Sequence, residues 1–313
     1  MKPSLPPAGH SLWSDRFPTR AECWQLRGRI LEFPRRPLLM GILNVTPDSF
    51  SDGGQFLAIQ AAVDQALRLA AEGAEILDIG GESTRPYSEP VNLMVELARI
   101  IPVITALRPH LLIPISIDTS KAAVAREAIA AGAEIINDIT GLEGDPQMVS
   151  VVRESQAGVC AMHMQGTPQT MQNSPTYDNV VEDVFAYLQG RRDSLLAGGI
   201  EAGRIALDPG IGFGKSHQHN LTLLAHCHRY HELACPILVG HSRKGFIAKV
   251  IGDKQADRTA GTIGTALSLA SQGVQILRVH DVAAVRQALL LYEATGGLDG
   301  QPLVLDEDQT ARL

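Results

Sequence analysis

The chain has 313 residues, of which 45% are hydrophobic and 19% charged, so it can bury a large core and is neither wholly disordered nor collagen-like. Lys and Arg number 27 against 34 Asp and Glu, which gives a net charge of −7. We therefore expect neither a nucleic acid nor an anionic membrane as a partner. An anionic ligand would need a local basic site.

The length suggests about two domains, unless the chain forms one large β/α barrel. The four cysteines, Cys23, Cys160, Cys227 and Cys235, are too few and too irregularly spaced for a disulfide framework or a paired-cysteine zinc site. The N-terminus lacks the pattern of a secretory signal, and no apolar stretch approaches the length of about 18 residues that crosses a membrane. We expect a soluble cytoplasmic protein.

The first 37 residues precede the main pattern of the chain. Residues 1–20 show no periodicity and predict a frayed or peripheral leader. Residues 21–37 predict a β-hairpin, because two short strand-like runs, Cys23–Arg27 and Arg29–Phe33, surround Gly28. We expect this hairpin to cover the floor of the domain that follows.

Residues 38–296 alternate short apolar runs with longer segments, such as Leu57–Glu72 and Asp257–Gln272, in which apolar residues lie three or four apart as in helices. This alternation predicts a parallel sheet covered by helices, and eight repeats favour a single closed (β/α)8 TIM barrel of the α/β class. A doubly wound open sheet is the alternative. The acidic tail, residues 297–313, predicts a peripheral segment. The eight runs are Leu38–Thr46, Ala74–Gly81, Leu111–Thr119, Glu134–Thr140, Gly158–Met164, Arg204–Gly210, Pro236–Ser242 and Val274–Asp281.

Each run becomes polar only at its C-terminal end. In a barrel these ends meet on one face, where the loops build the active site. The alternative is that such residues cap the next helix, and we prefer it for Asp138, Thr119 and Ser120. The polar ends comprise Asn44, Asp48, Asp78, Glu82, Asp118, Asn137, Asp138, His163, Asp208, Ser242, Lys244, Arg278 and His280.

Two segments resemble known motifs but do not match the residue pattern that each motif requires. The run Gly210–Ser216 resembles a phosphate-binding loop, but Pro209 stands where that motif requires glycine, so we expect a flexible loop. The histidines between His217 and His231 lack metal-ligand spacing and indicate a polar helix face.

The polar strand ends, taken in order, resemble those of dihydropteroate synthases. The matching segments are Asn44–Gly54, Asp78–Pro86, Ile117–Ser120, Ile136–Ile139, Met162–Gly166, Asp208–Lys215, Ser242–Lys244 and Arg278–Asp281. The resemblance implies a transferase on a β/α barrel that joins 4-aminobenzoate to 6-hydroxymethyl-7,8-dihydropterin diphosphate, releases diphosphate, uses Mg²⁺ and forms a homodimer. Sulfonamides, which mimic aminobenzoate, are implied inhibitors.

The resemblance also implies roles for individual residues. Lys244, Asp208, Arg278 and His280 would carry catalysis. The pterin would lie against Asp118, Asn137, Asp208 and Lys244, between Met162 and Phe213. Diphosphate would bind Asn44, Thr84, Arg85, Arg278 and His280, with Asn44 as the magnesium ligand. Aminobenzoate would contact Phe50, Arg85, Pro86, Ser242 and Lys244.

These roles suit the residue types. A pterin edge needs carboxylate and amide partners, and Arg278 and His280, two apart on one strand, point to the same side. Capping for Asn137, core packing for Met162 and Phe213, and a surface salt bridge for Arg85 are the alternatives. Rival functions are a pterin-dependent methyltransferase that serves a corrinoid, and a silent pterin-binding homologue.

Overall fold

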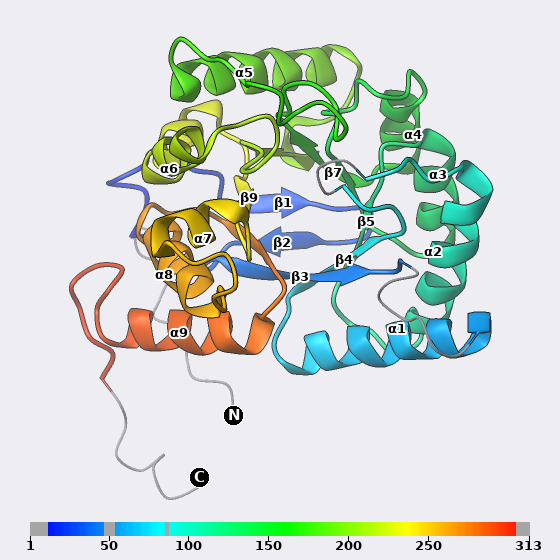
Figure 1. Ribbon diagram of the computed structural model, residues 1–313, viewed down its shortest axis with the longest axis horizontal. Helices are drawn as coiled ribbons and strands as arrows, with labels where there is room; N and C mark the ends of the chain where they lie inside the picture. The colour runs from blue at the N-terminus through cyan, green and yellow to red at the C-terminus, as the bar shows by residue number, and fades with distance from the viewer. Residues whose placement is uncertain (1–11, 47–53, 85–87, 305–313) are drawn as a thin grey trace, which may run out of the picture.

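A single parallel barrel forms the body of the protein (Figure 1). The computed structural model describes residues 12–46, 54–84 and 88–304, with only the backbone of residues 54–57. The strands are β3 (Leu38–Asn44), β4 (Ile76–Gly80), β5 (Ile115–Asp118), β6 (Ile135–Asp138), β7 (Gly158–Met162), β8 (Ile205–Asp208), β9 (Leu238–Gly240) and β10 (Ile276–Val279). Each lies within one of the eight predicted runs.

The sheet closes on itself. Its strand order is β8-β7-β6-β5-β4-β3-β10-β9, and a parallel bridge between Leu207 and Ile237 joins the two outer strands. The Leu207 N–H donates to the Pro236 carbonyl over 2.9 Å at this seam. The prediction of a closed (β/α)8 barrel is therefore confirmed, and the open doubly wound sheet is excluded.

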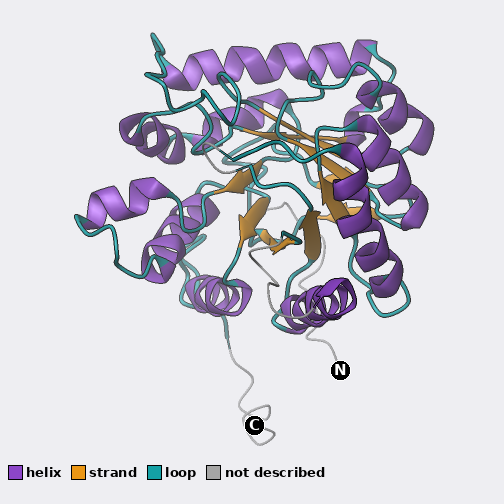
Figure 2. Ribbon diagram, turned by 45° about the vertical axis from the view of Figure 1, so that its right-hand side comes forward, coloured by secondary structure: helices purple, strands orange, loops and turns teal. Residues whose placement is uncertain are grey.

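Helices surround the strands on the outside (Figure 2). Because helices cover one face of each strand and side chains fill the barrel interior, both faces are buried, which explains the near-continuous apolar runs. The helices are α1 (Gly54–Ala71), α2 (Leu93–Leu107), α3 (Ala122–Ala131), α4 (Met148–Ser155), α5 (Val180–Ala197), α6 (His217–Ala225), α7 (Gly245–Ile251), α8 (Thr259–Ser271) and α9 (Val282–Ala294), with 3₁₀ turns η2 (Ala202–Arg204) and η3 (Cys227–Leu233).

The N-terminal hairpin covers the floor of the barrel, as predicted. Strand β1 (Cys23–Gln25) pairs antiparallel with β2 (Ile30–Glu32). Trp24 is fully buried and packs in one cluster with the first inward side chains of the barrel strands, among them Met40, Ile76 and Cys160. Its indole N–H donates to the Arg204 carbonyl over 2.8 Å, so the polar atom of this large side chain is satisfied.

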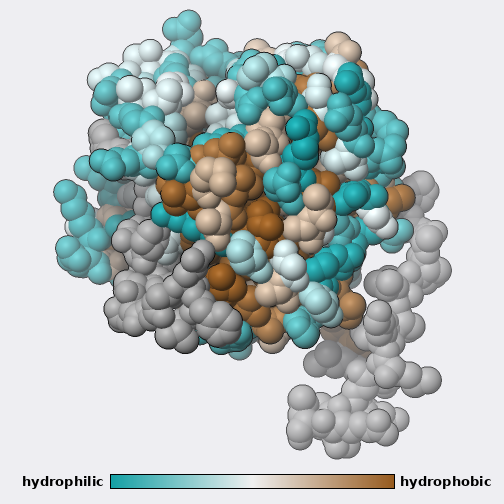
Figure 3. Space-filling view, turned by 90° about the vertical axis from the view of Figure 1, so that its right-hand side faces the viewer, coloured by the Kyte–Doolittle hydropathy of each residue, from teal (hydrophilic) through white to brown (hydrophobic). Residues whose placement is uncertain are grey.

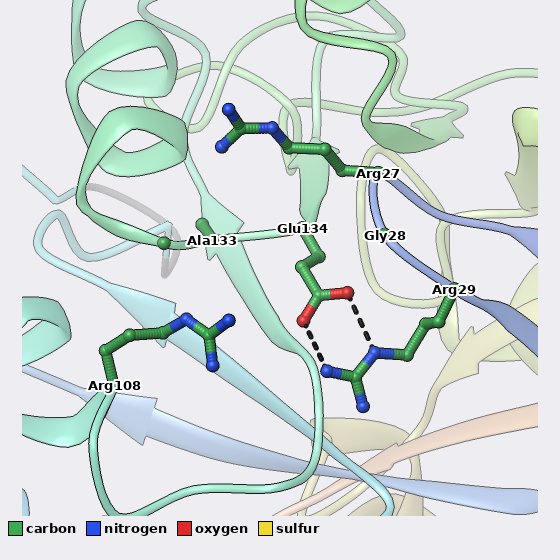
Figure 4. A pocket seen from close by; sticks show the side chains of 7 residues that line it. Arg27, Gly28, Arg29, Arg108, Ala133 and Glu134 are labelled. Atoms are coloured by element: carbon green, nitrogen blue, oxygen red, sulfur yellow. Dashed lines mark hydrogen bonds and ion pairs between the residues drawn. The ribbon is translucent and has the colours of Figure 1, made fainter.

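Arginines fasten the hairpin turn to the barrel around a cavity of about 340 Å³ (Figure 4). Arg29 forms two hydrogen bonds with Glu134, over 2.8 and 2.9 Å, and donates to the Leu112 carbonyl. Arg27 donates to the carbonyl of Ile129 on α3 over 2.6 Å. Since carbonyls at helix C-termini attract cations, these charges serve the attachment of the hairpin.

The predicted peripheral leader is wrong for residues 12–20. Trp13 is only 2% exposed and belongs to the main core, and it stacks on Phe17. Arg20 is buried and donates to the Gly273 carbonyl over 2.7 Å. Apart from the Trp13–Phe17 stack, these residues contact distant parts of the chain, such as Arg35 and Gly273, so no local periodicity predicts their burial. Residues 1–11 lie outside the described residues.

The C-terminal tail begins with a packed segment. Leu298 is buried, Asp299 pairs with Arg35, and the Leu303 N–H donates to the Ala294 carbonyl over 2.9 Å. The prediction of a peripheral tail is therefore wrong for its first residues, which fold back on α9. The run Asp306–Asp308 lies outside the part of the chain that the structure describes.

The outer surface mixes charge with apolar area. Figure 3 shows hydrophobic residues in the middle of one face with hydrophilic residues around them. Large hydrophobic side chains are exposed at the start of α2 and near the ends of α7 and α9. Within the described ranges, none of the helices combines the length and apolarity that a membrane span requires.

Removing a buried side chain from the hairpin should measurably lower the stability of the protein. Trp24→Ala should lower the free energy of unfolding by about 3–5 kcal/mol, because it removes a fully buried aromatic side chain and leaves a cavity. The matched control is Ile30→Ala on the partner strand, where the side chain is 61% exposed and a change within about 0.5 kcal/mol is expected. Urea unfolding followed by circular dichroism measures both; equal effects would contradict this view of the floor.

Candidate active site

A cavity of about 1130 Å³ opens at the C-terminal ends of the barrel strands. Its walls come from the ends of β3 and β10 and from the segments after β4, β7, β8 and β9. The structure thus brings together predicted site residues that are far apart in the sequence. Those that line the cavity are Asn44, Thr84, Phe213, Ser242, Lys244, Arg278 and His280.

Other predicted residues are buried beside this cavity without lining it. In the strand register Asp118 lies opposite Asn137, and Met162 lies opposite Asp208, so each pair occupies neighbouring positions on adjacent strands. All four are at least nine-tenths buried. Phe50, Arg85 and Pro86 lie outside the described residues, as does Asp48.

Arg278 joins two carboxylates across the barrel mouth. Its Nε donates to Asp78 over 2.6 Å and its Nη2 donates to Asp118 over 2.7 Å. The amide of Asn137 donates to the same Asp78 oxygen over 3.3 Å. Arg278 thus lines the cavity as predicted, but its Nε and Nη2 already donate to carboxylates, whereas neither ion pair uses Nη1. Sequence reasoning noted Asp78 at a strand end and did not assign it as the partner of Arg278.

These contacts change the titration of the carboxylates. Burial raises the pKa of Asp118 to about 7; Arg278 opposes the shift, whereas Asp78 and other nearby carboxylates add to it. Burial by itself lowers the pKa of Arg278, but Asp78 and Asp118 raise it more, so its net shift is upward. The guanidinium therefore stays charged at neutral pH, and Asp118 can exchange a proton there.

Asp208, buried at the end of β8, and Lys244, which lines the cavity from the loop after β9, are two opposite charges that shift each other's pKa. Burial raises the pKa of Asp208, whereas the Gly210 N–H, a donor at 2.7 Å, and Lys244 lower it. Burial also lowers the pKa of Lys244 to about 8, although Asp208 raises it. The Lys244 amine lies 4.5 Å from the centre of the Phe213 ring and donates to the Ile211 carbonyl.

Lys215 was missed as a site residue. It is almost fully buried, and its amine contacts His163 Nδ1 at 2.8 Å and donates to the Phe213 carbonyl over 2.9 Å. The Gly212 N–H, in addition, donates to Asn220 over 2.6 Å. The loop predicted over Gly210–Ser216 lies between β8 and α6, where its glycines allow a tight path with positive φ and the buried lysine fastens it.

The loop after β9 is held by polar contacts with residues that follow β10. Ser242 Oγ lies 3.1 Å from His280 Nδ1 and accepts from the His280 N–H over 3.3 Å. Arg243 lines the cavity, and its Nε donates to Asp281 over 2.8 Å. His241 is buried away from the cavity lining, and burial lowers its pKa to about 4, so it is neutral at pH 7.

Two of the residues predicted to cap the next helix stabilise the turn before it instead. Asp138 accepts hydrogen bonds from the N–H and hydroxyl of Thr140 over 2.8 and 2.7 Å. Thr119 Oγ1 accepts from the Lys121 N–H over 3.2 Å, just before α3. These contacts stabilise the turns after β5 and β6. The prediction that Asp138, Thr119 and Ser120 cap the next helix is wrong, because the N-cap residues are Lys121 for α3 and Gln147 for α4, and neither forms a side-chain capping hydrogen bond.

The donor atoms present suit a magnesium ion that arrives with phosphate oxygens. In the described parts of the chain no three His, Cys, Asp or Glu side chains gather as a protein-only metal site requires. Asn44 offers an amide oxygen in the cavity, whereas Asp78 and Asp118 are engaged by Arg278. Mg²⁺ often keeps only one or two protein ligands beside substrate phosphates and water, so this donor set fits such an ion.

Comparisons with known proteins agree with this geometry. The family model described as pterin binding enzyme matches residues 40–280. Dihydropteroate synthase from Haemophilus influenzae is 46% identical over 259 residues, which cover 83% of this chain and 94% of that protein. Two solved structures are also similar. The Yersinia pestis dihydropteroate synthase with a sulfonamide drug has TM-score 0.81 and 43% identity, covering 88% of this chain and 99% of that one.

The second structure is the Xanthomonas albilineans dihydropteroate synthase in complex with 7,8-dihydropteroate. It has TM-score 0.79 and 43% identity, and the match covers 87% of this chain and 98% of that one. The similarity spans nearly the whole barrel and nearly the full length of these relatives. The chain therefore belongs to the dihydropteroate synthase family of pterin-binding enzymes.

Proposed function

We propose that the protein is a transferase that condenses 6-hydroxymethyl-7,8-dihydropterin diphosphate with 4-aminobenzoate, giving 7,8-dihydropteroate and diphosphate. Beyond membership of the family, the observation that supports this proposal is that Lys244, Arg278 and His280 line one cavity at the barrel mouth, with Asp208 buried beside it. The Asp208–Lys244 pair suits the pterin, and Arg278 with His280 suits an anion. Neither rival function accounts for this combination together with the family match.

The pterin would bind on the side of Asp208. A carboxylate accepts from the exocyclic amine and ring N–H groups of a pterin, whereas a lysine ammonium donates to its carbonyl. Lys244 and the ring of Phe213 lie together on this wall, with Asp208, Asn137, Asp118 and Met162 buried behind it. Asp208, Asn137, Asp118 and Met162 stand on strand ends, which hold a rigid ligand accurately.

The diphosphate would bind on the side of Arg278, with His280, Thr84 and Arg85. Mg²⁺, held by Asn44 and the phosphate oxygens, would neutralise part of the diphosphate charge. Because Asp78 and Asp118 offset the charge of Arg278, this arginine alone would not attract a diphosphate strongly. Its Nη1 donors position the leaving group, and the remaining positive charge comes from the other members of the set.

The reaction forms one carbon–nitrogen bond and breaks one carbon–oxygen bond. The bond from the pterin methylene to diphosphate breaks with its electron pair on the leaving oxygen, and Arg278 and His280 stabilise that charge. The amine of 4-aminobenzoate then attacks the electron-poor methylene and loses a proton. No enzyme nucleophile is required. Phe50, Arg85, Pro86, Ser242 and Lys244 remain the predicted aminobenzoate contacts, and a cytoplasmic homodimer remains the predicted state.

Turnover by the purified protein tests the proposed reaction. With both substrates and Mg²⁺, we expect dihydropteroate and diphosphate in equal amounts by liquid chromatography. Asp208→Asn, which keeps the side-chain size, should lower kcat/KM by about 100-fold, because a hydrogen bond to a charged group contributes up to about 3 kcal/mol. Pterin binding without product formation by the wild-type protein would contradict the proposal.

The pKa of Lys244 predicts a pH dependence of pterin binding. The amine is protonated below its pKa of about 8, so affinity for 6-hydroxymethyl-7,8-dihydropterin should fall as the pH rises through 8. In Lys244→Arg the guanidinium stays charged up to about pH 12, so the fall should be absent. Calorimetric titrations above pH 7, where Asp118 is mostly ionised, separate the two groups. A fall of the same size in both proteins would contradict this assignment.

A further inference from the structure

We propose that Lys121, held by the buried Glu96, is a positioning residue that fixes the cavity wall around Ser83 and Thr84 for the diphosphate-bearing substrate. Neither Lys121 nor Glu96 lines the cavity. The inference rests on the proposed function, since it assigns these residues an effect on one substrate of that reaction. It concerns the segment that leads from β4 towards α2.

Glu96 is the buried centre of a hydrogen-bonded network that includes Thr119, Lys121 and Glu82. It lies on α2, its side chain is 0% exposed, and both carboxylate oxygens have partners. Oε1 accepts from the Thr119 hydroxyl over 2.7 Å, and Oε2 accepts from the Lys121 amine over 2.5 Å. The network therefore links α2 to the end of β5, immediately after Asp118.

Lys121 connects the buried Glu96 to the segment that forms the cavity wall. Its amine also donates to Oε2 of Glu82, while Glu82 Oε1 accepts from the Val91 N–H over 3.1 Å. Glu82 thus ties the beginning of the β4–α2 connection to its end. Arg99 adds a hydrogen bond to the Gly81 carbonyl over 2.7 Å. Ser83 and Thr84, which follow directly, line the cavity.

The charges of Lys121, Glu82 and Glu96 favour the arrangement in which the lysine amine stays between the two carboxylates. Burial alone lowers the pKa of Lys121, but its hydrogen bonds to Glu82 and Glu96 raise the value above that of a free lysine, so the amine stays charged. Removing it would leave Glu96 as a buried carboxylate without a cation. Because breaking a buried ion pair is costly, Lys121 has little freedom to leave its place between the two carboxylates.

The position of Glu96 argues for a role beyond folding. It shares the buried face of α2 with Ile100, Val103, Ile104 and Leu107. An apolar residue of similar volume would serve packing there equally well, since replacing a buried ion pair by hydrophobic groups is often neutral or stabilising. A charge retained at this point suits a network whose outer end must hold Glu82, and with it Ser83 and Thr84, in one place.

Lys121→Met tests the proposal. We expect kcat/KM for the pterin diphosphate to fall about 10- to 100-fold, because small displacements of substrate-positioning groups have effects of this size. Affinity for 6-hydroxymethyl-7,8-dihydropterin without diphosphate should stay unchanged, since Asp208 at the end of β8 and Lys244 at the start of α7 take no part in this network. Lys121→Arg, which preserves the cation, should restore most of the activity.

Arg229→Met is the matched control. Arg229 also joins two carboxylates, Glu182 and Glu232, and its side chain is 28% exposed against 27% for Lys121, but it lies away from the cavity lining. We expect it to leave kcat/KM unchanged. If Lys121→Met also leaves kcat/KM unchanged, or weakens binding of the pterin without diphosphate to the same degree, the proposal is wrong.

Hydrogen exchange tests the geometry independently of turnover. The Val91 amide donates to Glu82, so it should exchange faster in Lys121→Met than in the wild type or in Arg229→Met. Unchanged exchange would overturn the positioning role even if activity were lost. A wild-type protein without turnover would instead refute the proposed function, and the exchange experiment would still decide on the network. Glu82→Gln supplies a second variant should Lys121→Met fail to fold.

Discussion

The ion pairs of Arg278 with Asp78 and Asp118 are the constraint on which the candidate site depends. They join the ends of β4, β5 and β10 across the barrel mouth at distances of 2.6 and 2.7 Å. Two buried carboxylates this close would repel each other without the guanidinium, and the guanidinium would be costly to bury without them. The position of the cationic group in the cavity is therefore set by the carboxylates behind it. The arrangement also limits how much of its charge reaches a ligand.

The scaffold and the site occupy opposite ends of one barrel. At the floor, Trp24 and the hairpin close the interior with apolar packing, and Arg27 and Arg29 there bind the Ile129 carbonyl of α3 and Glu134. At the mouth, the inward positions of the same strands become polar. The division explains how a protein of net charge −7 holds an anionic substrate: its cations at the mouth are few, and strand ends and buried carboxylates place them.

The sequence allowed prediction of the barrel and of the face that carries the site, because apolar runs and polar strand ends are local patterns. It did not predict that Asp78 pairs with Arg278, 200 residues later, since the register of closed strands decides that contact. Lys215 was hidden within a glycine-rich segment that is typical of a mobile loop. Trp13 and Glu96 likewise acquire their roles from partners in other elements. Tertiary contacts, which leave no periodicity, account for each of these failures.

The central claim, that Arg278 is shared between carboxylates and the diphosphate, is tested most directly by the protons taken up when Mg-diphosphate binds. A ligand on Arg278 weakens its hold on Asp118, whose pKa of about 7 should then rise, so the protein should take up protons near neutral pH. Calorimetry in buffers of different ionisation enthalpy measures this uptake. The same measurement on Asp118→Asn gives the protons taken up by the ligand and by other groups, which are subtracted from the wild-type value. We predict greater uptake by the wild type than by Asp118→Asn. Equal uptake by the two proteins would contradict the sharing of Arg278.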